Sequence, residues 1–304
     1  MRPDVLVVGA GPAGVAAALW ARSLDLTARV IEGGPAPGGQ LHRLHFHPAN
    51  LAGVPEGDGA AIAAAMARQL AEAGIAVECG VEATALEGEP LAPLVRTARG
   101  ERLEAGAVLA ATGMRRRRLE VPGERELEDR GVSTSATRDR ARFAGRAVAV
   151  AGGGDAAFEN ALILAAAGCR VTLVVRGAAR ARAEFRARVA AEPRITCLTG
   201  TRITAVLGED RVRALALGGP AGGRTLEVEG LVIKAGSLPN SEWLAGALSL
   251  DAAGFVPVDA GLRTAHPRLW AAGDLTRPRR PSISSALGQA AAAMAAIRAA
   301  LRGE

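Results

Sequence analysis

The sequence has little with which to stack nucleic-acid bases or to cross-link itself. Among 304 residues there is no tyrosine, and three tryptophans and five phenylalanines make up 3% aromatic content. This poverty of stacking side chains disfavours nucleic-acid binding. The three cysteines, Cys79, Cys169 and Cys197, are odd in number and far apart. Their positions exclude a disulfide framework and a Cys-x-x-Cys redox or zinc site, and they are typical of a protein from the reducing cytoplasm.

Long uninterrupted hydrophobic segments are also missing. The uncharged stretch 5–20 is broken by glycines and a proline, so it does not resemble a signal-peptide core. The alanine-rich run 284–301 contains Gln289 and Arg298 and is too short to span a bilayer with these polar groups. We therefore expect a cytoplasmic protein without a membrane partner.

Basic residues outnumber acidic ones. There are 37 Lys and Arg against 31 Asp and Glu, which gives a net charge of +6, and Lys234 is the only lysine. This balance favours acidic partners or anionic ligands. The chain length accommodates two domains, and 49% apolar content is that of an ordinary globular protein.

The first thirty residues carry a dinucleotide-binding pattern. A predicted strand, 4–8, runs into Gly9-x-Gly11-x-x-Gly14, then a helix, then a second strand ending at Glu32. In this pattern Gly9 makes the tight turn, Gly11 admits a pyrophosphate and Gly14 lets helix and strand approach closely. Glu32 follows where an acid accepts hydrogen bonds from an adenosine ribose.

A second copy of the pattern begins near residue 146. A predicted strand, 147–150, leads into Gly152-x-Gly154-x-x-Ala157, a helix and a strand that ends at Val175. Here the next residue is Arg176 rather than an acid, and Arg180 and Arg182 follow. Because a carboxylate suits the free 2′-hydroxyl of NAD and an arginine suits the 2′-phosphate of NADP, this copy favours NADP.

Two further strand-closing turns bracket the second copy. Ala110-Ala-Thr112-Gly113 follows a predicted strand at 107–109, and Ala271-Ala-Gly273-Asp274 follows 268–270. The second copy therefore looks inserted into an outer unit. We expect an outer domain of residues 1–114 and 243–304 and an inserted domain of residues 115–242.

Seven ordered motifs resemble the low-molecular-weight thioredoxin reductases, of class II of the pyridine nucleotide-disulfide oxidoreductases. They are GAGPAG from Gly9, GGQL from Gly38, ATG from Ala111, GVS from Gly131, GGGDAA from Gly152, the Pro239-Asn240 turn and AAGD from Ala271. The resemblance covers nearly the whole chain. It implies a homodimer with an α/β fold of two Rossmann-like, three-layer β/β/α domains, the NADP domain being inserted in the FAD domain.

The same resemblance implies cofactor contacts at many positions. For FAD they are Gly9, Gly11, Gly14, Glu32, Gly39, Gln40, Leu41, Asn50, Thr112, Gly113, Gly273, Asp274, Ser282 and Ile283. For NADPH, with NADH as the alternative, they are Gly152, Gly154, Asp155, Ala156, Arg176 and Arg182.

The chain differs from this family in the motif that carries the redox-active cysteines. Where the family carries Cys-Ala-Thr-Cys-Asp, this sequence has Ser135-Ala-Thr-Arg138-Asp139. A serine cannot form a disulfide, so we expect no dithiol relay and no ordinary thioredoxin reductase activity. We also expect all three cysteines to be small buried hydrophobic residues rather than substitutes.

The replaced segment offers three candidate catalytic residues, Ser135, Arg138 and Asp139. An arginine at the flavin face would stabilise the anionic reduced flavin or hold an acidic substrate, and the alternative is a solvated Arg138. Asp139 either serves proton transfer, or pairs with Arg138, or caps a helix.

A histidine cluster follows the GGQL motif. His42, His45 and His47 lie within six residues. His42 or His45 would donate to an oxidised substrate at the flavin, and the alternatives are a hydrogen-bonded surface loop or a metal site. Because no cysteine or carboxylate lies nearby, we predict no metal.

These observations predict an FAD-dependent NAD(P)H oxidoreductase that passes electrons from flavin to an external acceptor, either a small molecule or a protein. A ferredoxin- or flavodoxin-NADP reductase is one alternative, because the resemblance extends to that related family and the positive net charge would suit an acidic carrier. A degenerate FAD-binding sensor that is not reduced by NAD(P)H is another.

Overall fold

The computed structural model describes residues 2–219 and 222–303. It divides into an outer unit, made of the residues up to Arg115 and those from Leu238 onward, and an inserted unit of residues 116–237. The crossings lie in two paired strands, β8 (Met114–Arg116) and β17 (Ser237–Pro239). Arg115 and residues 238–242, which were expected in the inserted domain, therefore group with the outer unit.

The outer unit is built on a parallel sheet. Its strand order is β18-β7-β1-β2-β3, and the strands are β1 (Val5–Val8), β2 (Ala28–Glu32), β3 (Val77–Cys79), β7 (Ala107–Ala110) and β18 (Leu269–Ala271). Every residue of β1 and β7 is buried, as in sheets covered on both faces.

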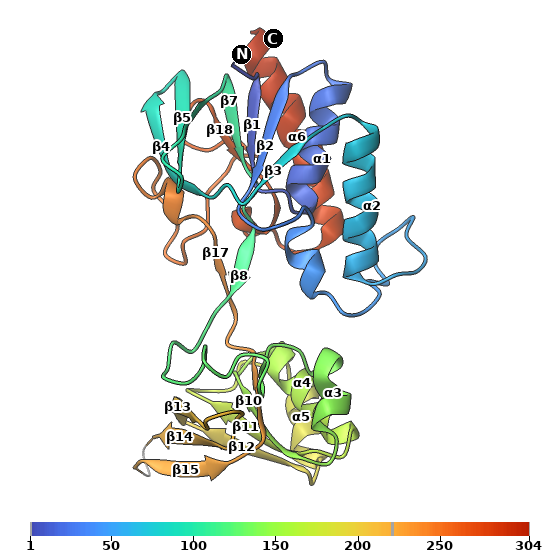
Figure 1. The fold of residues 1–304 in the computed structure, drawn as a ribbon, viewed down its shortest axis with the longest axis vertical. Helices are drawn as coiled ribbons and strands as arrows, with labels where there is room; N and C mark the ends of the chain where they lie inside the picture. Colours follow the sequence, from blue (N-terminus) through green and yellow to red (C-terminus); the bar gives the residue numbers. More distant parts are fainter. Residues whose placement is uncertain (1, 220–221, 304) are drawn as a thin grey trace. The chain divides into compact units, whose positions relative to one another are not determined.

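Helices cover one face of this sheet and strands cover the other (Figure 1). The helices are α1 (Pro12–Ser23), α2 (Gly59–Glu72) and α6 (Ile283–Arg302), and the second layer is antiparallel, with β4 (Ala83–Glu89), β5 (Ala92–Thr97) and β6 (Arg102–Glu104). Alternate β1 residues enter different cores: Val7 packs with the helices, and Leu6 packs with Val95 of β5. The strand period of two thus serves both layers.

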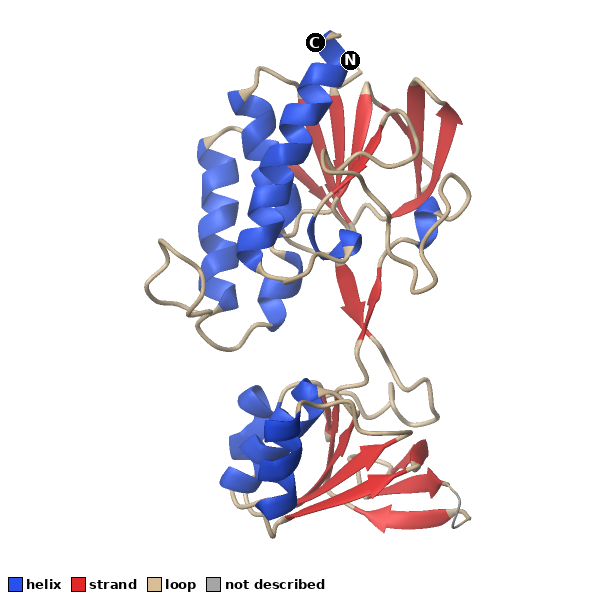
Figure 2. Ribbon diagram, turned by 180° about the vertical axis from the view of Figure 1, so that it is seen from behind, coloured by secondary structure: helices blue, strands red, loops and turns tan. Residues whose placement is uncertain are grey.

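The inserted unit repeats this plan (Figure 2). Its parallel sheet has the order β12-β11-β10-β16-β9, with β9 (Val132–Ser133), β10 (Ala147–Ala151), β11 (Arg170–Val175), β12 (Ile195–Thr199) and β16 (Gly230–Ile233). Helices α3 (Ala136–Phe143), α4 (Asp155–Ala166) and α5 (Ala183–Ala191) cover one face, and β13 (Arg202–Leu207), β14 (Ala214–Gly218) and β15 (Arg224–Glu227) cover the other. The expected pair of three-layer β/β/α units is confirmed.

Three 3₁₀ turns complete the outer unit: η1 (Gly39–Arg43), η2 (Glu242–Leu244) and η3 (Gly273–Thr276). In the part of the chain that the structure describes, none of the helices is long and apolar enough to cross a membrane.

Candidate dinucleotide sites and the α3 N-terminus

The glycine turn between β1 and α1 is only partly explained by the packing of the protein. A Cβ on Gly14 would lie 1.8 Å from the carbonyl oxygen of Gly9, and a Cβ on Gly9 would lie 2.5 Å from that of Ala111. Gly9 also has a φ of +102°. By contrast, a Cβ on Gly11 would meet nothing within 4 Å, and its φ of −71° suits any residue. The fold therefore requires glycine at positions 9 and 14 but not at position 11.

The turn between β10 and α4 has the same asymmetry. A Cβ on Gly152 would lie 2.2 Å from the carbonyl oxygen of Lys234, and Gly152 has a φ of +145°. A Cβ on Gly154 would meet nothing within 4 Å, and its φ is −99°. Gly11 and Gly154 thus leave matching open positions at the two turns.

Helices α1 and α4, which follow these turns, lack the side-chain cap that three other helices have. Side chains of Asp58, Ser135 and Ser282 accept a backbone N–H at the starts of α2, α3 and α6. Helices α1 and α4 begin at Gly11 and Gly154 without a side-chain cap. The N–H groups of their first turns, which in α1 begin at Ala13 because Pro12 has none, are therefore not capped by a side chain next to the open glycine. Together with the positive end of the helix dipole, this arrangement suits an anion such as a pyrophosphate.

Glu32 ends β2 beside the first turn. Its two carboxylate oxygens accept hydrogen bonds from the backbone N–H groups of Ala10 and Gly34, each at 2.7 Å. Because a carboxylate has about four acceptor positions, this anchored group retains capacity for ligand hydroxyls.

The GGQL and AAGD segments meet in the outer unit. The amide nitrogen of Gln40 donates to Asp274 at 3.1 Å, and a Cβ on Gly39 would lie 3.1 Å from the Cα of Gly11. Burial raises the pKa of Asp274, while the Gln40 hydrogen bond opposes this shift. The structure therefore brings Gly11, Gly39, Gln40 and Asp274 to one region.

Two residues that were not among the expected cofactor contacts, Gln289 and Asn240, hold these loops. Gln289 of α6 accepts from the backbone N–H of Gly273 at 2.7 Å and donates to Thr276 at 3.0 Å. Asn240 donates to the carbonyl oxygen of Thr112 at 2.8 Å, and the Thr112 hydroxyl donates to that of Asn240 at 2.6 Å. Each was indicated in the sequence, because Gln289 interrupts an alanine-rich run and Asn240 belongs to the Pro239-Asn240 motif.

Five expected FAD contacts lie in the core, in a helix start or in turns. Leu41 is buried in the helical core, and Ser282 forms a capping box with Ser285 at the start of α6, where Ile283 is the first helical residue. Asn50 lies exposed in a turn. The carbonyl oxygen of Gly113 accepts a backbone hydrogen bond from Asn240 at 2.9 Å.

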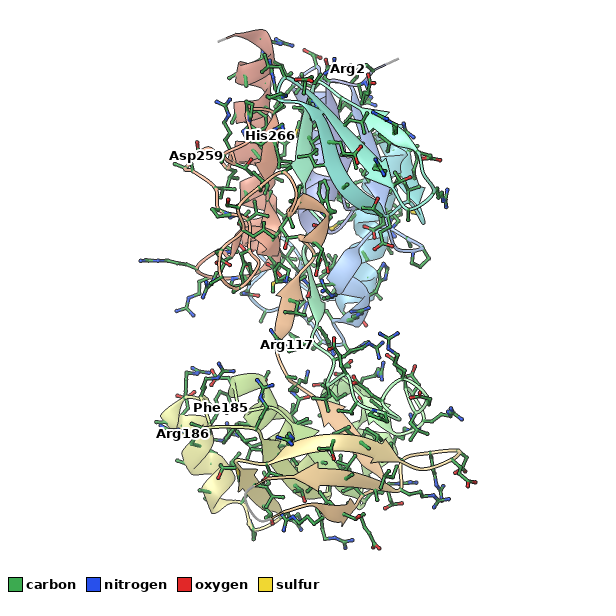
Figure 3. All side chains as sticks on the ribbon, turned by 90° about the vertical axis from the view of Figure 1, so that its left-hand side faces the viewer. Arg2, Arg117, Phe185, Arg186, Asp259 and His266 are labelled. Carbon is green, nitrogen blue, oxygen red and sulfur yellow. The ribbon has the colours of Figure 1, made fainter. Side chains whose placement is uncertain are left out.

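The histidines lie in different settings. His42 hydrogen-bonds through Nε2 to the carbonyl oxygen of Pro37 at 2.8 Å, and His47 through Nδ1 to that of Gly57 at 3.0 Å, whereas His45 is half-buried. The fourth, His266, precedes β18 and is labelled in Figure 3; burial lowers its pKa. Among residues 2–219 and 222–303, no group of three or more metal-ligating side chains could hold a metal ion.

The α3 N-terminus of the inserted unit is a polar cluster in which Arg138 is exposed. Ser135 is buried and caps the helix by accepting from the Arg138 N–H at 3.3 Å. The Arg138 guanidinium contacts Asp139 at 2.8 Å and Asp129 at 3.2 Å. Burial tends to raise the pKa of Asp139, but hydrogen bonds from Arg138 and Ser133 outweigh it and lower this pKa. Of the roles expected for Asp139, the structure shows the pairing with Arg138, and the residue that caps α3 is Ser135.

The candidate NADP-binding residues differ in whether their side chains already have a partner within the protein. Arg182 is held by Asp155, with its backbone N–H and its Nε each 2.7 Å from a carboxylate oxygen, and it stacks over Phe185 at 5.0 Å. Figure 3 labels Phe185 on α5. These contacts from Arg182 lower the pKa of Asp155. Arg176 is exposed, with no ion-pair partner among the described residues, and Ala156 is exposed in the first turn of α4.

The cysteine expectation is wrong for Cys197. Cys169 is buried and Cys79 half-buried, but Cys197 is exposed, because β12 is an edge strand of its sheet. All three are free thiols, and burial raises the pKa of Cys79 and Cys169.

Comparison with known proteins decides the family. A family model described as pyridine nucleotide-disulphide oxidoreductase matches residues 3–296. The chain belongs to this family. Members of the family use FAD and NADPH.

Relatives within the family include an alkyl hydroperoxide reductase subunit and thioredoxin reductases. An alkyl hydroperoxide reductase protein of Pseudomonas putida is 35% identical over 302 residues, which cover 95% of this chain but only 56% of that protein. A thioredoxin reductase of Mycolicibacterium smegmatis is 36% identical over 310 residues, which cover 97% and 96% of the two chains. The crystal structure of Lactococcus lactis thioredoxin reductase superposes with a TM-score of 0.82 at 27% identity and full coverage of both chains.

Proposed function

We propose that the chain is an FAD-dependent NAD(P)H oxidoreductase that passes electrons to an external acceptor without a disulfide of its own. The observation that carries the proposal is the pair of open glycines at uncapped helices, Gly11 and Gly154, in a chain whose α3 N-terminus holds Ser135 and Arg138. The expected net reaction for a two-electron acceptor A is NADPH + H⁺ + A → NADP⁺ + AH₂.

The outer unit fits FAD. The α1 N–H groups beyond Gly11 would hold the pyrophosphate, and Glu32 would accept from the adenosine ribose while its two backbone hydrogen bonds fix its orientation. Gln40 and Asp274 would lie along the rest of the cofactor, with Gln289 as a positioning residue for the Gly273 loop. The bound flavin supplies the acceptance of hydride and the onward transfer of electrons.

The inserted unit fits NADP(H). The α4 N–H groups beyond Gly154 would hold its pyrophosphate, and Arg176 would bind the 2′-phosphate because no carboxylate competes for it among the described residues. Arg182 must first exchange Asp155 for phosphate, so we assign it a smaller contribution.

A dithiol relay does not fit the α3 cluster. The thioredoxin reductases that this chain resembles have two cysteines at the positions of Ser135 and Arg138. Here Ser135 caps α3, and Arg138 is paired with two aspartates. Neither side chain can exchange a disulfide. We therefore propose that the acceptor takes electrons from flavin directly, and we assign Arg138, Asp139 and Ser135 to shaping this helix end rather than to electron transfer.

We also propose a cytoplasmic homodimer. Its three free thiols suit a reducing compartment, and the dimer is inferred from similarity to the thioredoxin reductases.

An acidic carrier such as ferredoxin or flavodoxin is the second candidate acceptor. Arg279 and Arg280 follow η3 a few residues after Asp274, are exposed and have no ion-pair partner among the described residues. Together with the net charge of +6, they favour an acidic docking partner over a neutral one.

Anaerobic stopped-flow mixing of the purified protein with NADPH or NADH tests the proposal. We expect bound FAD to bleach with either nucleotide and faster with NADPH at equal low concentration. A quinone, thioredoxin and a ferredoxin or flavodoxin then serve as acceptors, the carrier protein over a salt series. FAD that neither nucleotide reduces would instead support the sensor hypothesis, and rapid thioredoxin reduction would contradict the absence of a relay.

A further inference from the structure

Lys234, the only lysine of the chain, lies against the glycine turn of the inserted unit. It directly follows β16, and its backbone N–H donates to Ala151, the last residue of β10, at 2.7 Å. Its carbonyl oxygen is the group that a Cβ on Gly152 would strike. The backbone of Lys234 is therefore fixed at the carboxyl edge of the sheet, at the end of β16 and beside the central strand β10.

The outer unit has a different residue at the matching position. Ala111 follows β7, donates its N–H to Val8 at the end of β1 at 2.8 Å, and turns its carbonyl oxygen toward Gly9. Because the two parallel sheets share one strand order, Ala111 and Lys234 occupy equivalent positions. The outer unit places a buried alanine there, whereas the inserted unit places a half-buried cation.

The charged groups that face Lys234 are Arg116 of β8 and Glu159 of α4. Among the described residues no carboxylate lies within ion-pair distance of Lys234. Burial and the Arg116 charge lower the pKa of Lys234 to about 8, and the exposed Glu159 opposes them only in part. The ammonium is thus charged at neutral pH and loses its charge in mild alkali.

In a dinucleotide fold the cofactor crosses the carboxyl edge where the strand order reverses, here between β10 and β16. The adenosine ribose lies toward the second strand, β11, so the nicotinamide half lies toward β16 and Lys234. We propose that Lys234 is a specificity-determining residue that makes the inserted unit bind reduced nicotinamide in preference to oxidised nicotinamide.

The selectivity follows from charge. The nicotinamide ring carries one positive charge when oxidised and none when reduced, whereas the phosphates of the two forms are identical. Attraction between Lys234 and the phosphates therefore cancels in the ratio of the two dissociation constants, and repulsion of the oxidised ring remains. For two partly screened charges we expect this repulsion to weaken NADP⁺ by about tenfold. Product release would be favoured to the same extent.

The inference rests on the proposed binding of NADP(H), so the experiment measures binding rather than turnover. Isothermal titration of oxidised holoenzyme uses NADP⁺ and 1,4,5,6-tetrahydro-NADP, whose ring is uncharged and cannot donate hydride. We expect the ratio of the dissociation constants, NADP⁺ over tetrahydro-NADP, to fall by about tenfold between about pH 6.5 and about pH 9.5. The midpoint should lie near the Lys234 pKa of about 8.

Two variants isolate the side chain. Lys234→Met should give a low ratio at every pH, and Lys234→Arg should keep the high ratio at every pH because arginine stays protonated. A wild-type ratio that does not change with pH, or a Lys234→Met protein that keeps the pH dependence, overturns the inference while leaving the proposed function standing. Failure of wild-type holoenzyme to bind either ligand overturns both. If Lys234→Met lowers the melting temperature of the protein, the pH dependence of the ratio in Lys234→Arg tests the inference by itself.

Discussion

Replacement of Gly11 by serine should separate the stability of the outer unit from its affinity for FAD. The space around Gly11 is open, and its φ of −71° and ψ of −174° are ordinary for a residue that caps a helix. Serine is a better cap than glycine by a few tenths of a kcal/mol, and loss of a glycine restricts the unfolded chain by about 0.4–1 kcal/mol. The FAD-free variant should therefore be as stable as the wild type or slightly more stable.

FAD binding should respond in the opposite direction. The new side chain occupies the approach of a pyrophosphate to the α1 N–H groups. Loss of one charge-assisted hydrogen bond costs about 1.5–3 kcal/mol, which is about ten- to a hundredfold in affinity. Flavin fluorescence during titration of the FAD-free protein measures this change, and thermal unfolding of the same preparation measures stability.

Two control variants complete the design. Gly154→Ser should keep bound FAD and weaken NADP⁺ instead, because the equivalent open position belongs to the other unit. Gly14→Ala places a Cβ 1.8 Å from the Gly9 carbonyl oxygen, so it should cost about 3 kcal/mol and lower the melting temperature by at least about 6 °C. Wild-type FAD affinity in Gly11→Ser, or a melting temperature as low as that of Gly14→Ala, would refute the reasoning.

Three further outcomes are expected. Wild-type protein with NADPH should reduce a thioredoxin disulfide no faster than background. The double variant Ser135→Cys, Arg138→Cys should instead form a disulfide that the flavin reduces, as measured by thiol titration. Measurable thioredoxin reduction by the wild type would implicate an existing cysteine. Arg176→Ala should raise the NADPH concentration for half-maximal flavin reduction by about tenfold and leave that for NADH unchanged, and an equal effect on both would remove its assignment to the 2′-phosphate. Gln289→Leu should lose the hydrogen bonds to Gly273 and Thr276 and weaken FAD retention by about tenfold, with no change in NADP⁺ affinity; unchanged FAD content after dialysis would contradict a positioning role.

The fold could be predicted from sequence because its determinants are local. The Gly9 and Gly152 turns each need a positive φ, which the residue type indicates, and the flanking apolar runs identify the strands. The repeated pattern indicated two units of one plan, and both units bury a parallel sheet between a helical and a strand layer. The α/β class with two three-layer units was therefore correct.

The missed features depend on residues far apart in the chain. Gln289 accepts a hydrogen bond from Gly273 only because α6 packs beside η3. Asp155 accepts hydrogen bonds from Arg182, which lies 27 positions away in the sequence. Cys197 is exposed because β12 has no neighbour on one side, which its own sequence does not reveal. Residue type predicts which groups can bind a ligand, but tertiary contacts decide which of them are already occupied.

The strand order of the outer sheet also constrains when this protein can fold during synthesis. Strand β18 pairs with β7, and α6 packs on α1, so the outer unit lacks one strand and its longest helix until residues 269–302 have left the ribosome. The inserted unit is continuous in sequence and is complete by residue 237. Synthesis from the N-terminus therefore lets the inserted unit fold first. Until residues 269–302 have emerged, the apolar residues of β1, β2 and α1 stay exposed to solvent. The N-terminal segments of the outer unit are thus the part of the nascent chain in greatest need of protection from aggregation.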